Sequence, residues 1–160
     1  LIRYNDVAQK SMAAIKYKNR REYLDFYAEA IVRRYGNFFA RHKEAVLVPV
    51  PVHPVRLRSR GFNQAGELAV RLGHLSGLSV NETMLIRTRK TAPQKELGPE
   101  ERLRNLRKAF AVRKSTLPAT VILVDDIYTT GSTIEACTRV LKEAGVREVY
   151  FVSICIGGGV

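Results

Sequence analysis

Apolar side chains recur every three or four residues along several segments of the chain. Residues 22–41 show this period most clearly, which places an apolar stripe along one face of a helix. The stripe consists of Leu24, Tyr27, Ile31, Tyr35 and Phe38. Similar spacing predicts helices from Val7 to about Tyr17 and from Asn63, a capping residue, to about Leu75. We expect the tyrosines of the stripe to pack in the core rather than to stack on nucleobases.

Short apolar runs alternate with these helical segments and predict strands. The runs occupy residues 45–50, 84–88, 110–112, 121–125 and 148–154. Further helices are predicted from Pro99, where proline and acids suit a first turn, and from Thr133 to Ala144. Strands that alternate with helices form a mostly parallel sheet with helices on both faces. We therefore predict an α/β fold with three layers, α/β/α.

The segment Val121–Thr133 (VILVDDIYTTGST) carries the strongest functional pattern. A buried strand ends in Asp125 and Asp126, and small, hydroxyl-bearing residues then lead into a helix. Ionised carboxylates accept hydrogen bonds from sugar hydroxyls and suit a hydrated Mg²⁺. The unpaired N–H groups at a helix start carry about half a positive charge and attract phosphate. The segment therefore predicts a site for a sugar phosphate.

The loop of this segment is the candidate phosphate cradle. Gly131 permits a positive φ and a close approach of the backbone to a ligand. Hydroxyl donors surround it at Thr129, Thr130, Ser132 and Thr133. The alternative is an ordinary strand–turn–helix in which Asp126 orders the turn and Ser132 caps the helix. The acids, loop and helix start follow the strand in register, and this combination favours the site.

Alternating arginines follow the strand predicted at 45–50. In an extended segment Arg56, Arg58 and Arg60 would point to the same side, where three guanidinium groups suit a diphosphate. The alternative is that some of them cover the surface. His53, which stands between prolines, is more typical of a structural role. Ligands bind beyond the carboxyl ends of parallel strands, so this loop and the acid pair can face one ligand.

The acid–loop–helix segment resembles the phosphoribosyl diphosphate (PRPP) motif of type I phosphoribosyltransferases. Residues 48–64, 87–110 and 15–23 extend the resemblance over nearly the whole chain, and they are similar to the ComF family of competence-associated proteins. The resemblance implies one phosphoribosyltransferase-like domain over residues 1–160. It also implies a PRPP ligand, with Asp125 and Asp126 at the ribose and Mg²⁺ and with Thr129–Thr133 at the 5′-phosphate.

The same resemblance assigns further residues to the diphosphate. Val50 and Pro51, with the three arginines at 56, 58 and 60, correspond to the pyrophosphate loop. Residues 88–101 correspond to a flexible loop that closes over PRPP and excludes water. Four side chains in and beside that loop would then reach the diphosphate: Arg87, Arg89, Lys90 and Lys95.

Two departures from family patterns limit the expectations. The 6-oxopurine salvage enzymes carry an acidic residue where this chain has Thr129, and a threonine cannot act as a carboxylate base. Hypoxanthine or guanine salvage is therefore not expected. ComF relatives usually have an N-terminal zinc-binding segment with CxxC pairs, whereas this chain has only Cys137 and Cys155. We expect both thiols to be buried, with no zinc site in this chain and no disulfide framework.

The charge of the chain suggests a further kind of partner. The net charge is +12, and residues 86–114 alone contain ten basic and three acidic side chains. Such a field attracts polyanions, and single-stranded DNA is a candidate partner. The alternative is that these cations belong to solvated helix faces or contact PRPP. No apolar run approaches the roughly 18 residues of a membrane span, and no signal peptide is evident, so we expect a cytoplasmic protein.

Three functions are consistent with the sequence. The first is a PRPP-binding, Mg²⁺-dependent phosphoribosyltransferase of the ComF type that acts with the competence machinery on imported single-stranded DNA. The second keeps the PRPP pocket in a non-catalytic sensor or DNA-binding accessory protein. The third is a nucleobase salvage enzyme. The acceptor is not defined by the sequence, and homo-oligomers are left open.

Overall fold

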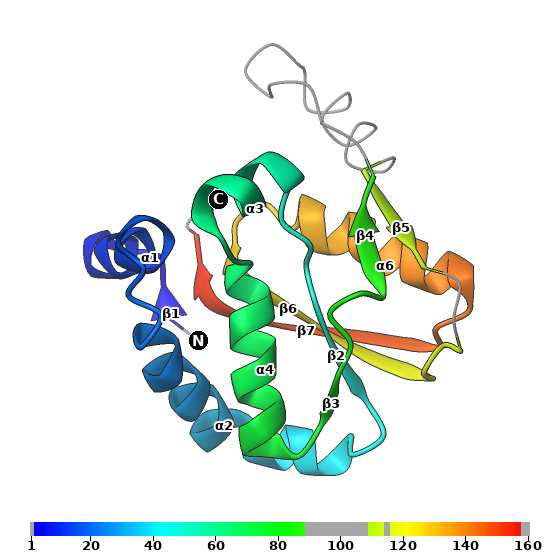
Figure 1. The fold of residues 1–160 in the computed structure, drawn as a ribbon. Helices are drawn as coiled ribbons and strands as arrows, with labels where there is room; N and C mark the ends of the chain where they lie inside the picture. Colours follow the sequence, from blue (N-terminus) through cyan, green and yellow to red (C-terminus); the bar gives the residue numbers. More distant parts are fainter. Residues whose placement is uncertain (1, 89–108, 114–115, 158–160) are drawn as a thin grey trace.

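A five-stranded parallel sheet forms the centre of the computed structural model, which describes residues 2–88, 109–113 and 116–157 (Figure 1). The strand order is β1-β7-β6-β2-β3, and each neighbouring pair is parallel. The strands are β1 (Ile2–Arg3), β2 (Val46–Pro49), β3 (Ser79–Val80), β6 (Thr120–Tyr128) and β7 (Glu148–Ile156). The central strand β6 extends three residues beyond the predicted run, so the acid pair lies within it.

Helices cover both faces of this sheet (Figure 1). One face carries α2 (Tyr23–Arg41) and α4 (Gln64–Ser76), joined at the side by α1 (Asp6–Lys18), and the other carries α6 (Ser132–Ala144). Side chains of the central strand pack alternately on its two faces. Ile122 and Val124 lie in the core under α2 and α4 (the α2–α4 core), whereas Val121 and Leu123 lie in the core under α6 (the α6 core). The prediction of a three-layer α/β/α fold with a mostly parallel sheet is confirmed.

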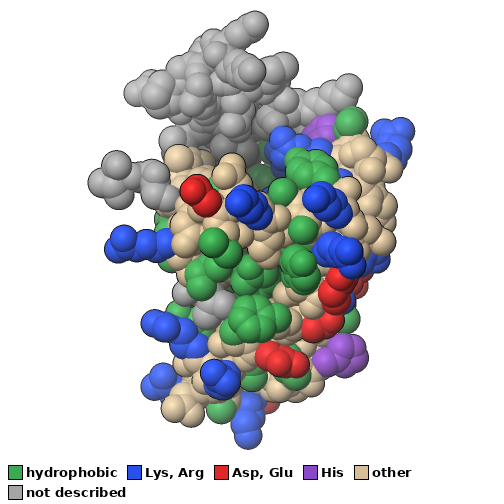
Figure 2. Space-filling view, turned by 90° about the vertical axis from the view of Figure 1, so that its left-hand side faces the viewer, with side chains coloured by type: hydrophobic (Ala, Val, Ile, Leu, Met, Phe, Trp, Pro, Cys, Tyr) green, Lys and Arg blue, Asp and Glu red, His purple; other side chains and the backbone are tan. Residues whose placement is uncertain are grey.

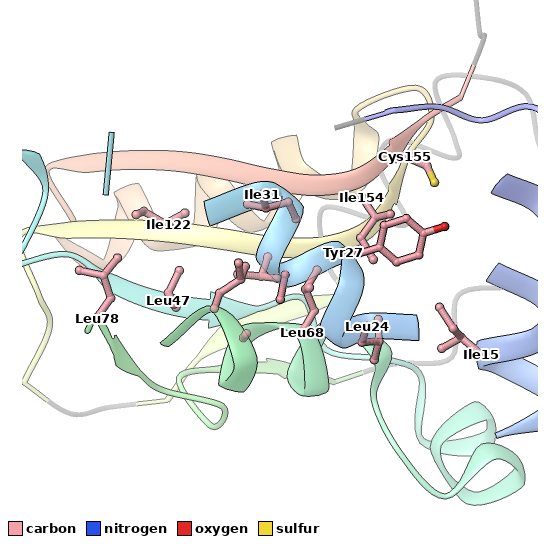
Figure 3. Close-up of a cluster of buried hydrophobic side chains, with 14 of the residues drawn as sticks. Ile15, Leu24, Tyr27, Ile31, Leu47, Leu68, Leu78, Ile122, Ile154 and Cys155 are labelled. Carbon is pink, nitrogen blue, oxygen red and sulfur yellow. The ribbon is translucent and has the colours of Figure 1, made fainter. Parts of the chain in front are cut away.

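The core beneath α2 and α4 is shown in Figure 3. Leu24 and Ile31 of α2 are fully buried there, as the helical stripe predicts. Tyr27 is also buried, and its hydroxyl hydrogen-bonds the Ser11 hydroxyl at 2.8 Å. The prediction for Tyr35 is wrong, because α2 departs from helical geometry at this residue (φ −118°, ψ 17°) and its side chain is 37% exposed.

A separate antiparallel ribbon stands beside the sheet. It consists of β4 (Leu85–Arg87) and β5 (Phe110–Val112), with Arg87 opposite Phe110. The helix predicted from Pro99 lies outside the described residues. Both cysteines are free and buried, as expected, with Cys155 in the α2–α4 core and Cys137 in the α6 core. Among the described helices, none combines the length and apolar character needed to cross a bilayer.

Candidate functional site

The two aspartates lie near the carboxyl end of the central strand, beside a small cavity. This acid-pair cavity has a volume of about 150 Å³, and its wall includes Asp125, Asp126, Thr133, Arg56, Arg60 and Lys16. One oxygen of each carboxylate accepts a hydrogen bond from the next backbone N–H, at 2.8 Å for Asp125 and 3.1 Å for Asp126. Both aspartates therefore shape the local backbone and also line a cavity. The structure thus combines the turn-ordering role of Asp126 with the position that the site hypothesis requires.

The two carboxyl groups have different electrostatic surroundings. Asp126 forms an ion pair with Lys16 of α1. Burial, and then the negative charge of Asp126, raise the pKa of Asp125 to about 8, while Lys16 acts in the opposite direction. Burial of Asp125 therefore favours the protonated form of its carboxyl group. A ligand that brings positive charge or hydroxyl donors would favour the ionised form.

The candidate phosphate loop joins β6 to α6. Gly131 has φ +79° and is the N-cap of α6, which has no side-chain capping hydrogen bond. Ser132 is therefore the first helical residue and does not cap the helix, and its hydroxyl lies 2.9 Å from that of Thr130. Thr133 lines the acid-pair cavity, whereas Thr129 and Thr130 are exposed. The start of α6 thus presents uncapped backbone donors near the acids.

The segment after β2 supplies another wall of the cavity. Val50, Pro51 and Val52 line it, and the Val50 N–H donates to the Val124 carbonyl at 2.9 Å. Asn63 caps α4 through a bond from Ala65 N, as predicted, and its Nδ2 donates to the Val50 carbonyl at 3.1 Å. This second bond fixes the loop to α4. The sequence predicts the cap, but nothing in it indicates that the same amide holds the cavity wall.

The arginines at 56, 58 and 60 are not in an extended segment, so that prediction is wrong. They belong to a seven-residue helix, α3 (Pro54–Arg60). His53 caps it by accepting from Val55 N, Pro54 suits its first turn, and Gly61 ends it in the left-handed conformation. In a helix, residues four apart share a face and residues two apart do not. Accordingly Arg56 and Arg60 line the acid-pair cavity, whereas Arg58 does not, although Arg56 and Arg58 are both exposed.

The antiparallel ribbon contributes one further cation. Arg87 at the end of β4 lines the acid-pair cavity, with its guanidinium over the Phe110 ring at 5.3 Å. Burial, and then the positive charge of Arg56, lower its pKa. The other predicted loop cations, Arg89, Lys90 and Lys95, lie outside the described residues. Arg87 is thus the member of that set that the structure places at the cavity.

Lys16 and Gln64 are lining residues that the sequence did not indicate as site residues. Gln64, at the first turn of α4, is 4% exposed and accepts a bond from Arg60 at 3.2 Å. Lys16 reaches the acids from α1, at the opposite end of the sequence. Lys16 and Gln64 fall in residues 15–23 and 48–64, which resemble ComF proteins. This resemblance is the feature of the sequence that could have indicated them as site residues.

The donor set around the cavity limits how a metal ion could bind. In the described part of the chain, no group of three or more His, Cys, Asp or Glu side chains could hold one. Mg²⁺ is commonly held by one or two carboxylates together with phosphate oxygens and water. The acid pair fits that pattern, since Asp125 and Asp126 can supply the protein ligands when a ligand brings phosphate. The site thus suits Mg²⁺ that arrives with a phosphate-bearing ligand.

The parallel sheet with helices on both faces is the fold of the phosphoribosyl transferase class. Residues 17–158 match the model of the phosphoribosyl transferase domain, so the chain belongs to that family. Within it, relatives named Competence protein F, Competence protein ComFC and DNA utilization protein YhgH confirm the ComF resemblance.

Three curated relatives illustrate the sequence similarity to this family. Competence protein F of Haemophilus influenzae is 36% identical over 64% of this chain and 46% of its own length. DNA utilization protein YhgH of Salmonella typhi is 34% identical over 68% of this chain and 48% of its own length. Competence protein ComFC of Streptococcus pneumoniae is 32% identical over 71% of this chain and 49% of its own length. The chain thus spans about half the length of the curated relatives it matches.

Proposed function

We propose that the chain binds PRPP in the acid-pair cavity. The observation that carries this proposal is the convergence of acids, cations and a helix start on one cavity in a phosphoribosyl transferase domain. Asp125 and Asp126 would accept hydrogen bonds from the ribose hydroxyls, and residues 129–133 would hold the 5′-phosphate. The diphosphate would lie against Val50, Pro51, Arg56 and Arg60.

We further propose that the bound PRPP can react by phosphoribosyl transfer. The bond between ribose C1 and the diphosphate oxygen would break, and pyrophosphate would leave with the electron pair. A nucleophile would then bond to C1 and lose its proton. The arginines stabilise the negative charge that develops on the leaving group, and Mg²⁺ bound with PRPP supplies further positive charge there. The chain itself would mainly orient the reactants, so no side-chain nucleophile is needed.

The names of the relatives support a cellular role for this activity. One relative is called a DNA utilization protein and two are called competence proteins. With the net charge of +12, this supports a role in handling imported single-stranded DNA in the cytoplasm with the competence machinery. Figure 2 shows Lys and Arg side chains spread over the face that it presents, with acidic groups among them. A non-catalytic PRPP sensor or DNA-binding accessory protein is the second candidate, because the cations extend beyond the cavity.

Calorimetry with PRPP, with and without Mg²⁺, tests the proposed ligand. We expect saturable binding that Mg²⁺ strengthens, and absence of binding in both conditions would contradict the proposal. Pyrophosphate release with a panel of nucleobases and nucleotides then separates transferase from sensor. A fluorescent single strand titrated with salt reports the number of DNA phosphates neutralised. Release with hypoxanthine or guanine is not expected, since Thr129 offers no carboxylate base.

The helical form of α3 makes a specific prediction about its arginines. Replacing Arg56 with alanine should weaken PRPP binding about tenfold, the size of a lost charge-assisted contact to phosphate. Arg58→Ala removes the same charge from the same helix at a position that does not line the cavity, and it should change the affinity less than about twofold. Calorimetry of the two variants measures the difference. Equal losses at both positions would show that only the general positive field matters.

A further inference from the structure

Lys16 lies where two cavities meet. One is the acid-pair cavity, and the other, of about 390 Å³, lies between α1 and α3. Arg56 and Arg60 also line both cavities. The cation on α1 therefore belongs to the same wall as the two cations on α3, although more than 30 positions of sequence separate the helices.

The ion pair between Lys16 and Asp126 is largely shielded from water. The exposed fractions of the two side chains are 17% and 16%. The ammonium contacts Asp126 Oδ2, while Oδ1 accepts the N–H of Ile127. A carboxylate in such surroundings requires an opposite charge close by, because its desolvation is otherwise uncompensated. Lys16 provides that charge.

This position gives Lys16 opposite effects on metal ions and phosphates. A divalent cation prefers ionised carboxylate oxygens, and one of those nearest the cavity is already held by the ammonium. A phosphate-bearing ligand instead offers the ammonium another partner, since phosphate accepts charge-assisted hydrogen bonds as carboxylate does. Arg56 and Arg60 attract the anion and oppose a free metal ion in the same way.

We propose that Lys16 selects the ions that enter the site. Its ammonium takes the place beside Asp126 that a metal ion would occupy, and it transfers to the diphosphate when the ligand binds. The Lys16–Asp126 pair therefore disfavours the binding of a free divalent cation, and the site accepts the cation together with the ligand. The inference rests on the proposed function, because it assigns a binding role at the proposed PRPP site.

Removing the charge of Lys16 should move two affinities in opposite directions. Lys16→Met keeps most of the buried hydrocarbon stem and removes the ammonium. We expect Mn²⁺ alone, followed by electron paramagnetic resonance, to bind about tenfold more tightly, and metal-free pyrophosphate, followed by calorimetry, to bind about tenfold more weakly. Lys16→Arg retains the charge and should change both affinities less than about threefold.

Lys10→Met is the matched control, since Lys10 is an exposed cation on the same helix. It should leave both affinities unchanged. Should Lys16→Met fail to fold, Lys16→Gln carries the same two expectations. Parallel losses of both ligands, or no change in either, would show that Lys16 only supports the structure and would overturn the inference.

The two proposals can fail separately. If the wild-type protein binds pyrophosphate through Lys16 but does not bind PRPP, the proposed function is wrong and the role of Lys16 stands. If PRPP binds to the wild-type protein and the Lys16→Met variant alike, and the Mn²⁺ affinity is unchanged, the role of Lys16 is wrong and the proposed function stands.

Discussion

Asp125→Asn is expected to abolish PRPP binding and to stabilise the folded protein at the same time. The loss of binding follows because an amide offers one acceptor oxygen and no charge, whereas the ionised carboxyl accepts ribose hydroxyls and can ligate Mg²⁺. The local backbone should be preserved, since the asparagine Oδ1 can still accept the Asp126 N–H. The ionised form of Asp125, which the proposed ligand would need, is thus the form that burial disfavours.

The gain in stability depends on pH with a definite sign. The pKa of Asp125 in the folded state is about 8, above the ordinary 3.8 of the unfolded chain. Between these values the folded protein retains a proton that the unfolded chain has lost, so the wild-type free energy of unfolding falls as pH rises. One proton gives a slope of up to about 1.4 kcal/mol per pH unit. The asparagine of Asp125→Asn does not titrate, so the free energy of unfolding of this variant should lack this pH dependence.

Urea unfolding of both proteins at pH 5, 6.5 and 8 measures this difference. We expect the stability of Asp125→Asn relative to wild type to grow with pH across that range. Asp126→Asn is the matched variant and should lose about 1–3 kcal/mol, because it leaves the shielded ammonium of Lys16 without its carboxylate. A pH-independent difference at Asp125 would contradict the raised pKa, and retained PRPP binding would contradict its place in the site.

The acid pair and the α6 loop were predictable from sequence because local residues determine them. The apolar run of β6 faces a core on each side, so it must be a central strand, and the aspartates at its end must lie at the ligand edge. Asn63 likewise predicts the start of α4, because its side chain accepts the capping hydrogen bond from Ala65 N. In each case the determining contacts lie within a few residues.

The parts that the sequence did not reveal depend on competing local signals or on distant contacts. Alternating arginines suggest an extended loop, yet His53 and Pro54 begin a helix and Gly61 ends it, so that α3 forms. The Lys16–Asp126 pair joins two segments far apart in the sequence, and no spacing rule predicts it. The sequence did not reveal the kink at Tyr35 either. The spacing of apolar residues predicts which side chains are buried only if the helix is regular, and α2 departs from helical geometry at this residue.

Gly131→Ala is expected to distort the candidate phosphate loop. The residue has φ +79°, and a Cβ there would lie 2.5 Å from the Tyr128 hydroxyl oxygen. The Tyr128 ring is stacked on Phe151 with centroids 5.1 Å apart, which limits how far it can retreat. The strained backbone alone costs about 1–3 kcal/mol. We expect lower stability and at least about tenfold weaker binding of PRPP, equivalent to about 1.4 kcal/mol.

Gly145→Ala separates the cost of backbone strain from the effect on the site. Gly145 has φ +114° at the other end of α6, and an added Cβ there would meet nothing within 4 Å. It should lower the free energy of unfolding while leaving PRPP affinity unchanged. Thermal unfolding and calorimetry on both variants provide the comparison, with ribose 5-phosphate as a ligand that lacks the diphosphate. Because the loop is proposed to hold the 5′-phosphate, Gly131→Ala should weaken both ligands alike; a loss confined to PRPP would place the loop at the diphosphate instead.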